Sequence, residues 1–461
     1  MRQLISTTNT KTSTKAPLIF HVYALFFCLT VIAINPFAVT RGSIWTQPKI
    51  LCVFAIVILH LLILFKERQP IRRPNQWKLQ VFGWLALLAS GIISTLLSPF
   101  PSRSFFGHSI TADGWLYWLL IAGFVLTNSL VLKQYPRLFL WQLRGILVGA
   151  TLVALSMYPQ FLNWKLDYTA DSGQLWPGTE HVLATGIYQD HQPVGLYSHR
   201  GYASFALAIA SVLSLVALKK QWLSARVALP LTALHAITLS LARVRGAMLA
   251  MLLAWLWLAW TTPRRRSTQQ LIIALSLIGL LSFGWTTMER RVINADFYAS
   301  TPFRVALKHF TSDRIFLWQK AWQGILKRPW FGWGFSGYSI ADTYYLCPEG
   351  TEPVILEDYF THCQLETGET VQVSAKAIHA HNVFLDKYIA LGVVGASIYL
   401  VLMSYYALAV LKAKPEILAL VITYASYMLT WYDCGQLSHL GWWALSIQTS
   451  LRHTSVINND H

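Results

Sequence analysis

Charged residues are scarce in this chain, and their scarcity argues against an ordinary soluble protein. Asp, Glu, Lys and Arg make up 12% of its 461 residues, whereas a typical soluble domain carries about 25%. The acidic residues are the scarcer charge, since 20 of them stand against 37 Lys and Arg, while hydrophobic residues reach 54%. We therefore expect a large part of the chain to lie in a lipid bilayer.

Motifs of several enzyme classes are also missing from the sequence. It contains no P-loop, no GxSxG nucleophile elbow and no HExxH metal motif, which counts against nucleotide-driven transport and serine hydrolysis. Residues 332–337 have glycines at dinucleotide-binding spacing, but no strand is predicted before them. The basic residues lack interleaved aromatics on one face, so nucleic acid is not an expected partner.

Cysteine is rare as well, and five residues are too few for a disulfide framework. Cys28 and Cys52 lie inside apolar runs, whereas Cys347 and Cys363 lie in a long polar segment. If that segment faces an oxidising compartment, the latter pair could form a disulfide that closes a small loop. The alternative is two unrelated free thiols.

Long apolar runs are what the chain has in place of charge. Each can cross a hydrocarbon core about 30 Å thick, and hydropathy gives about eleven or twelve spans. The runs begin near Leu18, Ile50, Leu79, Trp115, Leu138, Tyr202, Val227, Ala247, Leu271, Val383 and Ile417, with a weaker one near His439. The predicted fold class is an all-α polytopic membrane protein with about 12 transmembrane helices and one large extracytoplasmic loop containing amphipathic helices.

Lysine and arginine are concentrated in every second connection between these runs, for example from Lys66 to Lys78. The positive-inside rule assigns that side to the cytoplasm, so both termini are predicted to be cytoplasmic. The predicted division is a cytoplasmic tail (1–16), transmembrane helices 1–9 (17–286), an extracytoplasmic loop subdomain (287–380), transmembrane helices 10–12 (381–452) and a second cytoplasmic tail (453–461).

The extracytoplasmic segment contains one clear helical pattern. Apolar residues recur at helical spacing between Arg314 and Lys327, and Arg328-Pro329 ends the pattern. Its aromatic residues predict an amphipathic helix that lies along the membrane surface or under the loop. A glycine-rich turn over residues 331–338 follows it.

Several arginines fall on the outer side, where the positive-inside rule disfavours them. Arg243 and Arg245 lie in a short turn between two spans, Arg314 starts the amphipathic helix, and Arg200 lies at the outer start of another span. Arginine keeps its charge and presents a planar fork of donors, which suits a phosphate or diphosphate. The alternative is that these side chains extend to lipid headgroups.

A histidine pair, His379 and His381, lies where the long polar segment ends and the span starting at Val383 begins. Histidine is the side chain most easily used as a base near neutral pH. The pair could instead clamp a metal, but no convincing third ligand is nearby, because Asp386 falls inside the next span. The other alternative is a structural histidine at the membrane–water interface whose hydrogen bonds are satisfied. The neighbouring Asn382 favours a functional role instead.

Several short motifs resemble those of the O-antigen ligase and polymerase superfamily of bacterial membrane glycosyltransferases. His381-Asn-Val-Phe-Leu followed by Gly392-Val-Val-Gly395 resembles its HN-x-x-L…G-x-x-G signature. Further similar segments are Arg245-Gly-Ala247 (the S-R-G-A turn), Asp313-Arg314 with Trp318 (the R-x-x-x-W helix start), residues 329–338 (P-x-x-G-x-G), and residues 94–99 with Gly107 and Asp113-Gly114 (the early outer loop). The resemblance spans roughly residues 80 to 400 and rests on motif order and spacing.

Two departures from the family pattern leave alternatives open. Val244 stands where the family usually has serine, and Arg243 adds a second candidate arginine. His379 competes with His381, although the pattern selects His381 because Asn382 follows it.

The resemblance implies transfer of a polysaccharide from undecaprenyl diphosphate to an acceptor hydroxyl, on lipid A-core or a similar molecule, without a metal or cofactor. His381 would be the catalytic base, Arg245, Arg314 and Arg200 would hold the diphosphate, and His379, Arg243 and Asn382 are secondary candidates. The reaction would invert the anomeric centre.

The implied location is the bacterial cytoplasmic (inner) membrane, with an extracytoplasmic active site and a role in lipopolysaccharide biosynthesis. The partners would be the lipid-linked glycan donor, a glycolipid or glycan acceptor and the bilayer. A polysaccharide polymerase or a protein O-oligosaccharyltransferase would use the same motifs. A transporter or flippase of the lipid-linked glycan is the rival from a different class, and it would need no base.

Overall fold

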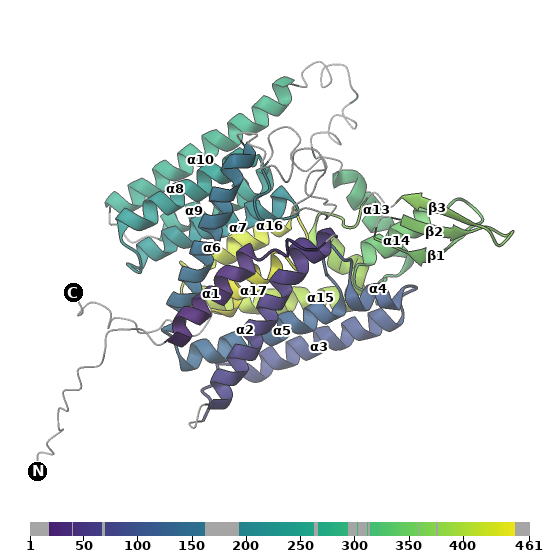
Figure 1. The fold of residues 1–461 in the computed structure, drawn as a ribbon, viewed down its shortest axis with the longest axis horizontal. Coiled ribbons are helices and arrows are strands. Elements are labelled where there is room, and N and C mark those ends of the chain that lie inside the picture. The colour runs from purple at the N-terminus through teal and green to yellow at the C-terminus, as the bar shows by residue number, and fades with distance from the viewer. Residues whose placement is uncertain are drawn as a thin grey trace, which may run out of the picture.

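The computed structural model describes residues 18–38, 40–66, 70–161, 193–261, 266–293, 302, 311, 314–358, 360–374 and 377–447. Both predicted cytoplasmic tails, 1–16 and 453–461, lie outside these residues, as does Asp313. The described part of the chain is mostly helical, with helices packed side by side and a small sheet at one end (Figure 1). The helical membrane fold class is confirmed at this level.

A helix forms at each apolar run of the sequence. These helices are α1 (Leu18–Ile32), α2 (Gln47–Lys66), α3 (Trp77–Leu96), α5 (Trp115–Gln134), α6 (Leu138–Phe161), α7 (Arg200–Lys219), α8 (Ala225–Leu241), α9 (Arg245–Thr261), α10 (Arg266–Ile293), α15 (Val383–Ala413), α16 (Leu418–Met428) and α17 (Ser438–Ser446). Among the described residues, seven helices are long and apolar enough to cross a membrane, and four shorter apolar helices accompany them. The count of 12 spans stays a prediction.

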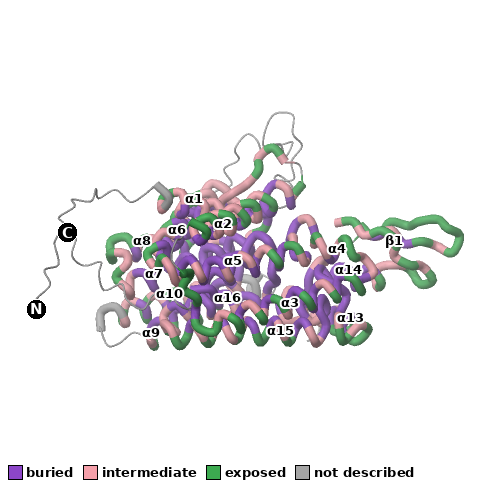
Figure 2. Tube along the Cα trace, turned by 90° about the horizontal axis from the view of Figure 1, so that it is seen from below, coloured by how far each residue is buried: buried purple, intermediate pink, exposed green. Residues whose placement is uncertain are grey.

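The most enclosed helix is α7, which packs against α6, α8, α9 and α16. Its residues from Gly201 to Ala217 are all buried, whereas only 11% of the apolar window within α10 is buried. Buried residues accordingly concentrate in the middle of the bundle, with exposed residues at its surface (Figure 2). An apolar helix with so little burial inside the protein fits a position facing lipid.

The two ends of the bundle differ in chemistry. Helices α13 (Arg314–Lys327) and α14 (Gly337–Leu346) lie at the same end as the sheet (Figure 1). Helix α15 starts against both of them and runs away for 31 residues. Beyond its far end, Glu416 pairs with Lys220 at 2.8 Å and with Lys219 at 3.8 Å, at the end of α7. These lysine-rich connections therefore gather at one end, and which side of a membrane that end faces stays a prediction.

A three-stranded antiparallel sheet, which the sequence reasoning did not predict, lies in the segment between α14 and α15. Its strands are β1 (Glu352–Leu356), β2 (Phe360–Gln364) and β3 (Thr370–Ser374), in the order β1-β2-β3. The strands have five residues each, and β1 and β3 are mostly exposed. Such short strands give only a weak signal in a sequence, and of the three only β3, Thr370-Val-Gln-Val-Ser374, alternates polar and apolar residues.

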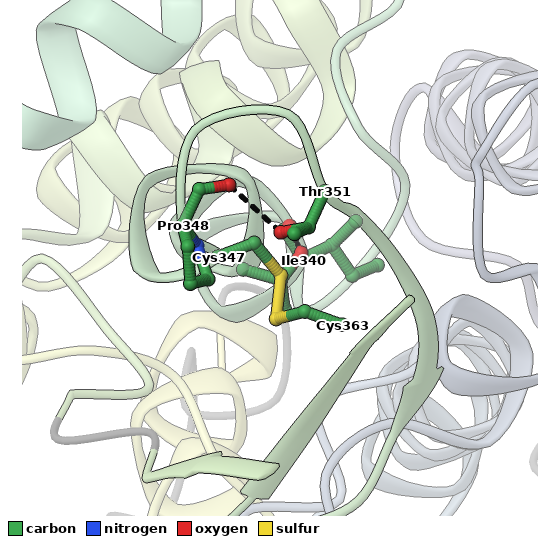
Figure 3. The surroundings of a disulfide bond; sticks show 6 residues. Ile340, Cys347, Pro348, Thr351 and Cys363 are labelled. Carbon is green, nitrogen blue, oxygen red and sulfur yellow. Dashed lines mark hydrogen bonds between the residues drawn. A yellow bond between two sulfur atoms is a disulfide. The ribbon is translucent and has the colours of Figure 1, made fainter. Parts of the chain in front are cut away.

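A disulfide joins the sheet to the helical part of this segment. Cys363 in β2 is bonded to Cys347, which directly follows α14 (Figure 3), and their Cα atoms lie 5.6 Å apart. Cys363 is fully buried, and Thr351 Oγ1 donates to Pro348 O at 2.7 Å in the enclosed loop. The disulfide therefore fixes the buried face of β2 against the end of α14.

Helix α15 is broken at Gly392, where φ is 64° and ψ is −171°. The residues after α13 fill the gap in the hydrogen-bond ladder: Trp333 N donates to Ile389 O and Gly334 N to Ala390 O, both at 2.9 Å. In return, Val393 N donates to Pro329 O at 2.8 Å. Residues 329–334 thus replace the lost helical hydrogen bonds, which a broken helix in a membrane protein requires.

Ser94, near the C-terminal end of α3, contacts both sides of this junction. Its Oγ lies 2.5 Å from Phe331 O and 2.8 Å from Ala390 O, which share its one proton, and it accepts from Gly334 N at 3.1 Å. Three segments that the sequence related only through motif order, 94–99, 329–334 and 392–395, are therefore joined through hydrogen bonds at one place.

Candidate functional site

The segment His379-Ala-His-Asn382 leads directly into α15, and Asn382 caps that helix. The Oδ1 of Asn382 accepts from Phe384 N at 3.0 Å and from Leu385 N at 3.1 Å, while its Nδ2 donates to Leu429 O at 3.1 Å. An asparagine N-cap is worth about 1 kcal/mol. The contact with Leu429 also ties the start of α15 to the end of α16.

His381 has a left-handed backbone conformation, with φ of 52°. This conformation costs a residue with a side chain about 1–2 kcal/mol, so the surrounding contacts must hold it. The imidazole packs edge-on against Trp431 at 4.8 Å and Tyr432 at 5.0 Å between ring centroids. Its Nδ1 is buried, and no described residue hydrogen-bonds to it. The ring is thus held by aromatic packing.

His379 lies between two carboxylates. Its Nδ1 is 3.5 Å from Asp386 Oδ1, and its Nε2 is 3.9 Å from Asp113 Oδ2. The ring also stacks on Tyr432, with centroids 3.9 Å apart and planes 11° apart. Asp113 in turn accepts from Ser336 Oγ at 2.7 Å. The loop before α5, the glycine-rich segment and the histidine segment therefore meet at Asp113.

The two histidines are placed in opposite electrostatic surroundings. Burial, together with the charges of Arg314, His379 and His199, holds the pKa of His381 well below its usual range. Burial alone would lower the pKa of His379, but the interaction with Asp386 and the charges of Asp386 and Asp113 outweigh it and raise that pKa. The surroundings of His381 therefore favour the uncharged imidazole, whereas those of His379 favour the charged one.

The carboxylate of Asp113 complements this charge. Burial would raise its pKa, but the charge of His379 and hydrogen bonds from Ser336, the His108 backbone and Thr111 lower it below the usual range. A buried charged pair persists only when its partners satisfy the lone pairs and protons. Asp113 therefore stays ionised beside His379.

Arg200 and Arg314 are brought toward the same histidines. Desolvation of its ring, together with the charges of Arg200, Arg41 and Arg314, lowers the pKa of His199 to about 4 although the residue as a whole is exposed, and Arg314 also acts on His381. His199 is the N-cap of α7, because its Nδ1 accepts from Gly201 N at 2.9 Å. Arginine charge thus reaches both His199 and His381.

Four helices begin around the connection between α16 and α17. Arg200, Arg245 and Arg314 are the first residues of α7, α9 and α13, and α15 begins directly after Asn382. At Gly201 an added Cβ would lie 2.5 Å from the Trp431 ring, and at Gly246 it would overlap Thr430 Oγ1. Helix N-termini carry unpaired N–H groups and partial positive charge, which favour a bound anion.

Arg243 occupies a different position from Arg245. It lies in the turn between α8 and α9 with φ of 54°, and its backbone N donates to Ser240 O at 3.1 Å. Val244, which stands at the serine position of the family motif, is 9% exposed. The choice between the two arginines stays open.

Further site residues were missed by the sequence reasoning, chiefly Lys387 and Asp433. Lys387 Nζ lies 3.3 Å from Asp433 Oδ2 and 3.9 Å from the centre of the Trp118 ring. The Asp433 carboxylate also accepts from Tyr399 and Tyr424 hydroxyls at 3.0 and 2.5 Å. Ionisable residues inside apolar segments are the sequence signal that could have found this pair.

Asp386 was set aside because it falls inside the next span; the structure places it in the first turn of that helix, α15, where it lies against His379. With Asp113, His379, Lys387 and Asp433 it lines a narrow cavity of about 20 Å³. Among the described residues, no group of three or more His, Cys, Asp or Glu side chains is arranged to hold a metal ion. Metal independence stays a prediction.

Residues 230–400 match the family model described as O-antigen ligase. A general O-oligosaccharyltransferase of Acinetobacter baylyi (strain ATCC 33305 / BD413 / ADP1) is 28% identical over 172 residues, which cover 33% of this chain and 30% of that protein. The family match contains Arg243, Arg245, Arg314, His379 and His381, but not Arg200. The resemblance drawn from the short motifs is confirmed over this segment.

Proposed function

The segment 230–400 is an O-antigen ligase family segment, and from that premise we propose that this protein is a membrane glycosyltransferase of the ligase type. It would move a polysaccharide from undecaprenyl diphosphate to an acceptor hydroxyl, on lipid A-core or a similar molecule. The observation that carries the proposal is an uncharged, half-buried His381, with a buried Nδ1, beside a region where several helices start with arginine. The first supplies a base and the second binds an anion.

The donor's diphosphate would sit against Arg245, Arg314 and Arg200 at the starts of α9, α13 and α7. Arginine offers two parallel hydrogen bonds to phosphate oxygens, and the helix N-termini add partial positive charge. As the bond between the anomeric carbon and the diphosphate breaks, negative charge grows on the leaving group. Fixed positive charge at that place stabilises the transition state.

His381 would accept the proton of the acceptor hydroxyl as its oxygen attacks the anomeric carbon. The new glycosidic bond forms while the bond to the diphosphate breaks, so undecaprenyl diphosphate leaves with the electron pair. Attack from the face opposite the leaving group inverts the anomeric centre. Because the pKa of His381 is held well below its usual range, the imidazole is uncharged and able to take a proton at neutral pH, and an arriving anionic donor raises its basicity.

The proposal is tested with His381→Ala in purified protein reconstituted with a defined lipid-linked oligosaccharide and acceptor. Loss of a general base lowers turnover by roughly 10²- to 10⁴-fold, and donor binding is expected to persist. The matched control is His362→Gln, because His362 lies in β2, where it contacts Glu357 at 3.2 Å. Full activity of His381→Ala would overturn the base assignment. Passage of the lipid-linked glycan across the membrane by the wild-type protein, with no transfer to any acceptor, would favour the transporter alternative.

The arginine assignment has its own measurement. Arg245→Ala or Arg314→Ala is expected to weaken binding of the lipid-linked donor, because each removes a fixed charge from the proposed diphosphate site. Unchanged donor affinity in both variants would contradict it. Transfer that is lost on chelation and restored by zinc would instead support the metal alternative for His379 and His381.

A protein O-oligosaccharyltransferase is the second candidate, favoured by the name of the Acinetobacter baylyi relative. It shares the donor and the chemistry and differs in the acceptor. Supplying the reconstituted protein with lipid A-core, a growing glycan and a polypeptide acceptor in parallel separates ligase, polymerase and protein glycosylation. The proposed location is the bacterial cytoplasmic membrane with both termini inside. Cysteine labelling at positions 66 and 357 from the same side would contradict it.

A further inference from the structure

We propose that His379, Asp113 and Asp386 form a positioning unit, in which a charged imidazole held between two carboxylates keeps His381 oriented for proton transfer. The inference rests on the proposed function, because it assigns a role relative to the base His381. It gives His379 a function other than the competing base or the metal ligand that the sequence left open.

The first argument is the backbone on either side of His381. Asp386 Oδ1 accepts from Ala380 N at 2.9 Å, and the same oxygen lies 3.5 Å from His379 Nδ1. On the other side, Asn382 is fixed by its capping bonds at the start of α15. His381 is thus held in its left-handed conformation between two residues whose backbone or side chain is fixed by hydrogen bonds. The carboxylate of Asp386, which fixes the residue before it, also contacts His379.

The second argument is the ring that both histidines share. Tyr432 stacks on His379 and meets the edge of His381, so it forms a common wall for both imidazoles. The Tyr432 hydroxyl lies 2.6 Å from that of Tyr202 on α7, so a hydrogen bond fixes the Tyr432 ring to the most enclosed helix. A displacement of His379 would therefore be passed through Tyr432 to His381.

The third argument is charge. His379 faces Asp113 from the loop before α5 and Asp386 from α15, and Lys387 and Asp433 line the same cavity. With Lys387 as the only other cation among these lining residues, the three carboxylates favour a positive His379. Arg314 and His199 act on the neighbouring His381 together with His379. A positive charge on His379 therefore lowers the proton affinity of His381 until an anionic donor binds.

His379→Gln tests the unit, because glutamine keeps polar atoms in the cavity but carries no charge. The turnover number for transfer is expected to fall roughly 10- to 100-fold, as misplacement of a catalytic group by about 1 Å does, with the donor KM changed less than about twofold. Without the positive charge, His381 binds its proton more tightly, so the acid limb of the pH–rate profile moves to higher pH. His362→Gln, on the exposed sheet, serves as the matched control and is expected to leave both unchanged.

Asp113→Asn provides a second variant if His379→Gln fails to fold. It keeps an oxygen that can accept from Ser336 but removes one of the two charges facing His379. Turnover is expected to fall with little change in donor KM. The matched control is Asp342→Asn, since Asp342 is 4% exposed and paired with Lys320 at 2.7 Å, in the contact between α13 and α14.

The outcomes separate the inference from the proposed function. Wild-type turnover together with an unmoved acid limb in His379→Gln would overturn the inference, and so would an acid limb that moves to lower pH. A loss as complete as that of His381→Ala would also overturn it, because His379 would then have to carry the proton. Full activity of His381→Ala, or no transfer by the wild-type protein, would instead count against the proposed function.

Discussion

Replacing Gly392 by alanine is expected to separate the broken helix α15 from residues 329–334, which supply its missing hydrogen-bond partners. Gly392 has φ of 64° and ψ of −171°, a region that is essentially restricted to glycine. An added Cβ would overlap the carbonyl group of Trp330 and lie 2.5 Å from Phe331 N. These are backbone atoms, held in place by hydrogen bonds across the junction, so they cannot give way as the end of a flexible side chain could.

Two contributions set the size of the effect. The backbone strain of a residue with a side chain in this region costs about 1–3 kcal/mol, and forcing extra volume into a packed contact costs about 1–3 kcal/mol more. The free energy of unfolding should therefore fall by about 2–6 kcal/mol, the sum of these two ranges. Transfer activity should fall as well, because His381 is positioned at the start of the same helix.

Two other glycines provide matched controls. Gly350 has φ of 79° but no atom near an added Cβ, so Gly350→Ala carries only the backbone strain, about 1–2 kcal/mol. Gly284, in α10, also has open space around it, and alanine there is expected to stabilise the helix by about 0.5–1 kcal/mol. Thermal unfolding in detergent should rank Gly284→Ala highest and Gly392→Ala lowest. Equal midpoints for the Gly392 and Gly350 variants would refute the reasoning.

Two further predictions concern the segment between α10 and α15. Asp358 ties the loop between β1 and β2 to Arg103 with an ion pair of 2.7 Å. Asp358→Asn should therefore lower the free energy that holds the sheet in place by about 1 kcal/mol. Limited proteolysis should cut the sheet faster in this variant, and an unchanged cleavage rate would contradict the prediction. Trp322 on α13 is 54% exposed. If α13 lies along the membrane surface, Trp322→Asp should reduce quenching of a label on α13 by brominated lipid, whereas Gln323→Asp should not, and equal quenching in both would argue that α13 lies under the loop instead.

The junction at Gly392 also explains how distant motifs act on one site. Residues 329–334 continue from α13, which begins at Arg314, and they are bonded to α15, which begins beside His381. Asp113 then joins the loop before α5 to both Ser336 and His379. A rigid connection of this kind keeps the proposed diphosphate arginine and the proposed base at a fixed separation, as a transfer reaction requires.

The sequence by itself determined the class of protein and the positions of its helices. Scarce charge and long apolar runs depend only on composition and local order, so all twelve runs correspond to helices of the structure. The helix over 314–327 was predicted with the bounds it has, because amphipathic periodicity is a local signal. His381 was singled out by the family resemblance, whose pattern has asparagine directly after the histidine, and in the structure that asparagine caps α15.

Only the tertiary structure decided what surrounds those residues. The carboxylates of Asp113 and Asp386, separated by most of the chain, meet at His379, and no local pattern predicts such a meeting. The short strands of the sheet depend on pairing with each other and on the Cys347–Cys363 disulfide, so their own sequences mark them only weakly, with alternation in β3 alone. The opposite pKa shifts of two histidines in one tetrapeptide likewise arise from burial and neighbouring charge, which folding alone creates.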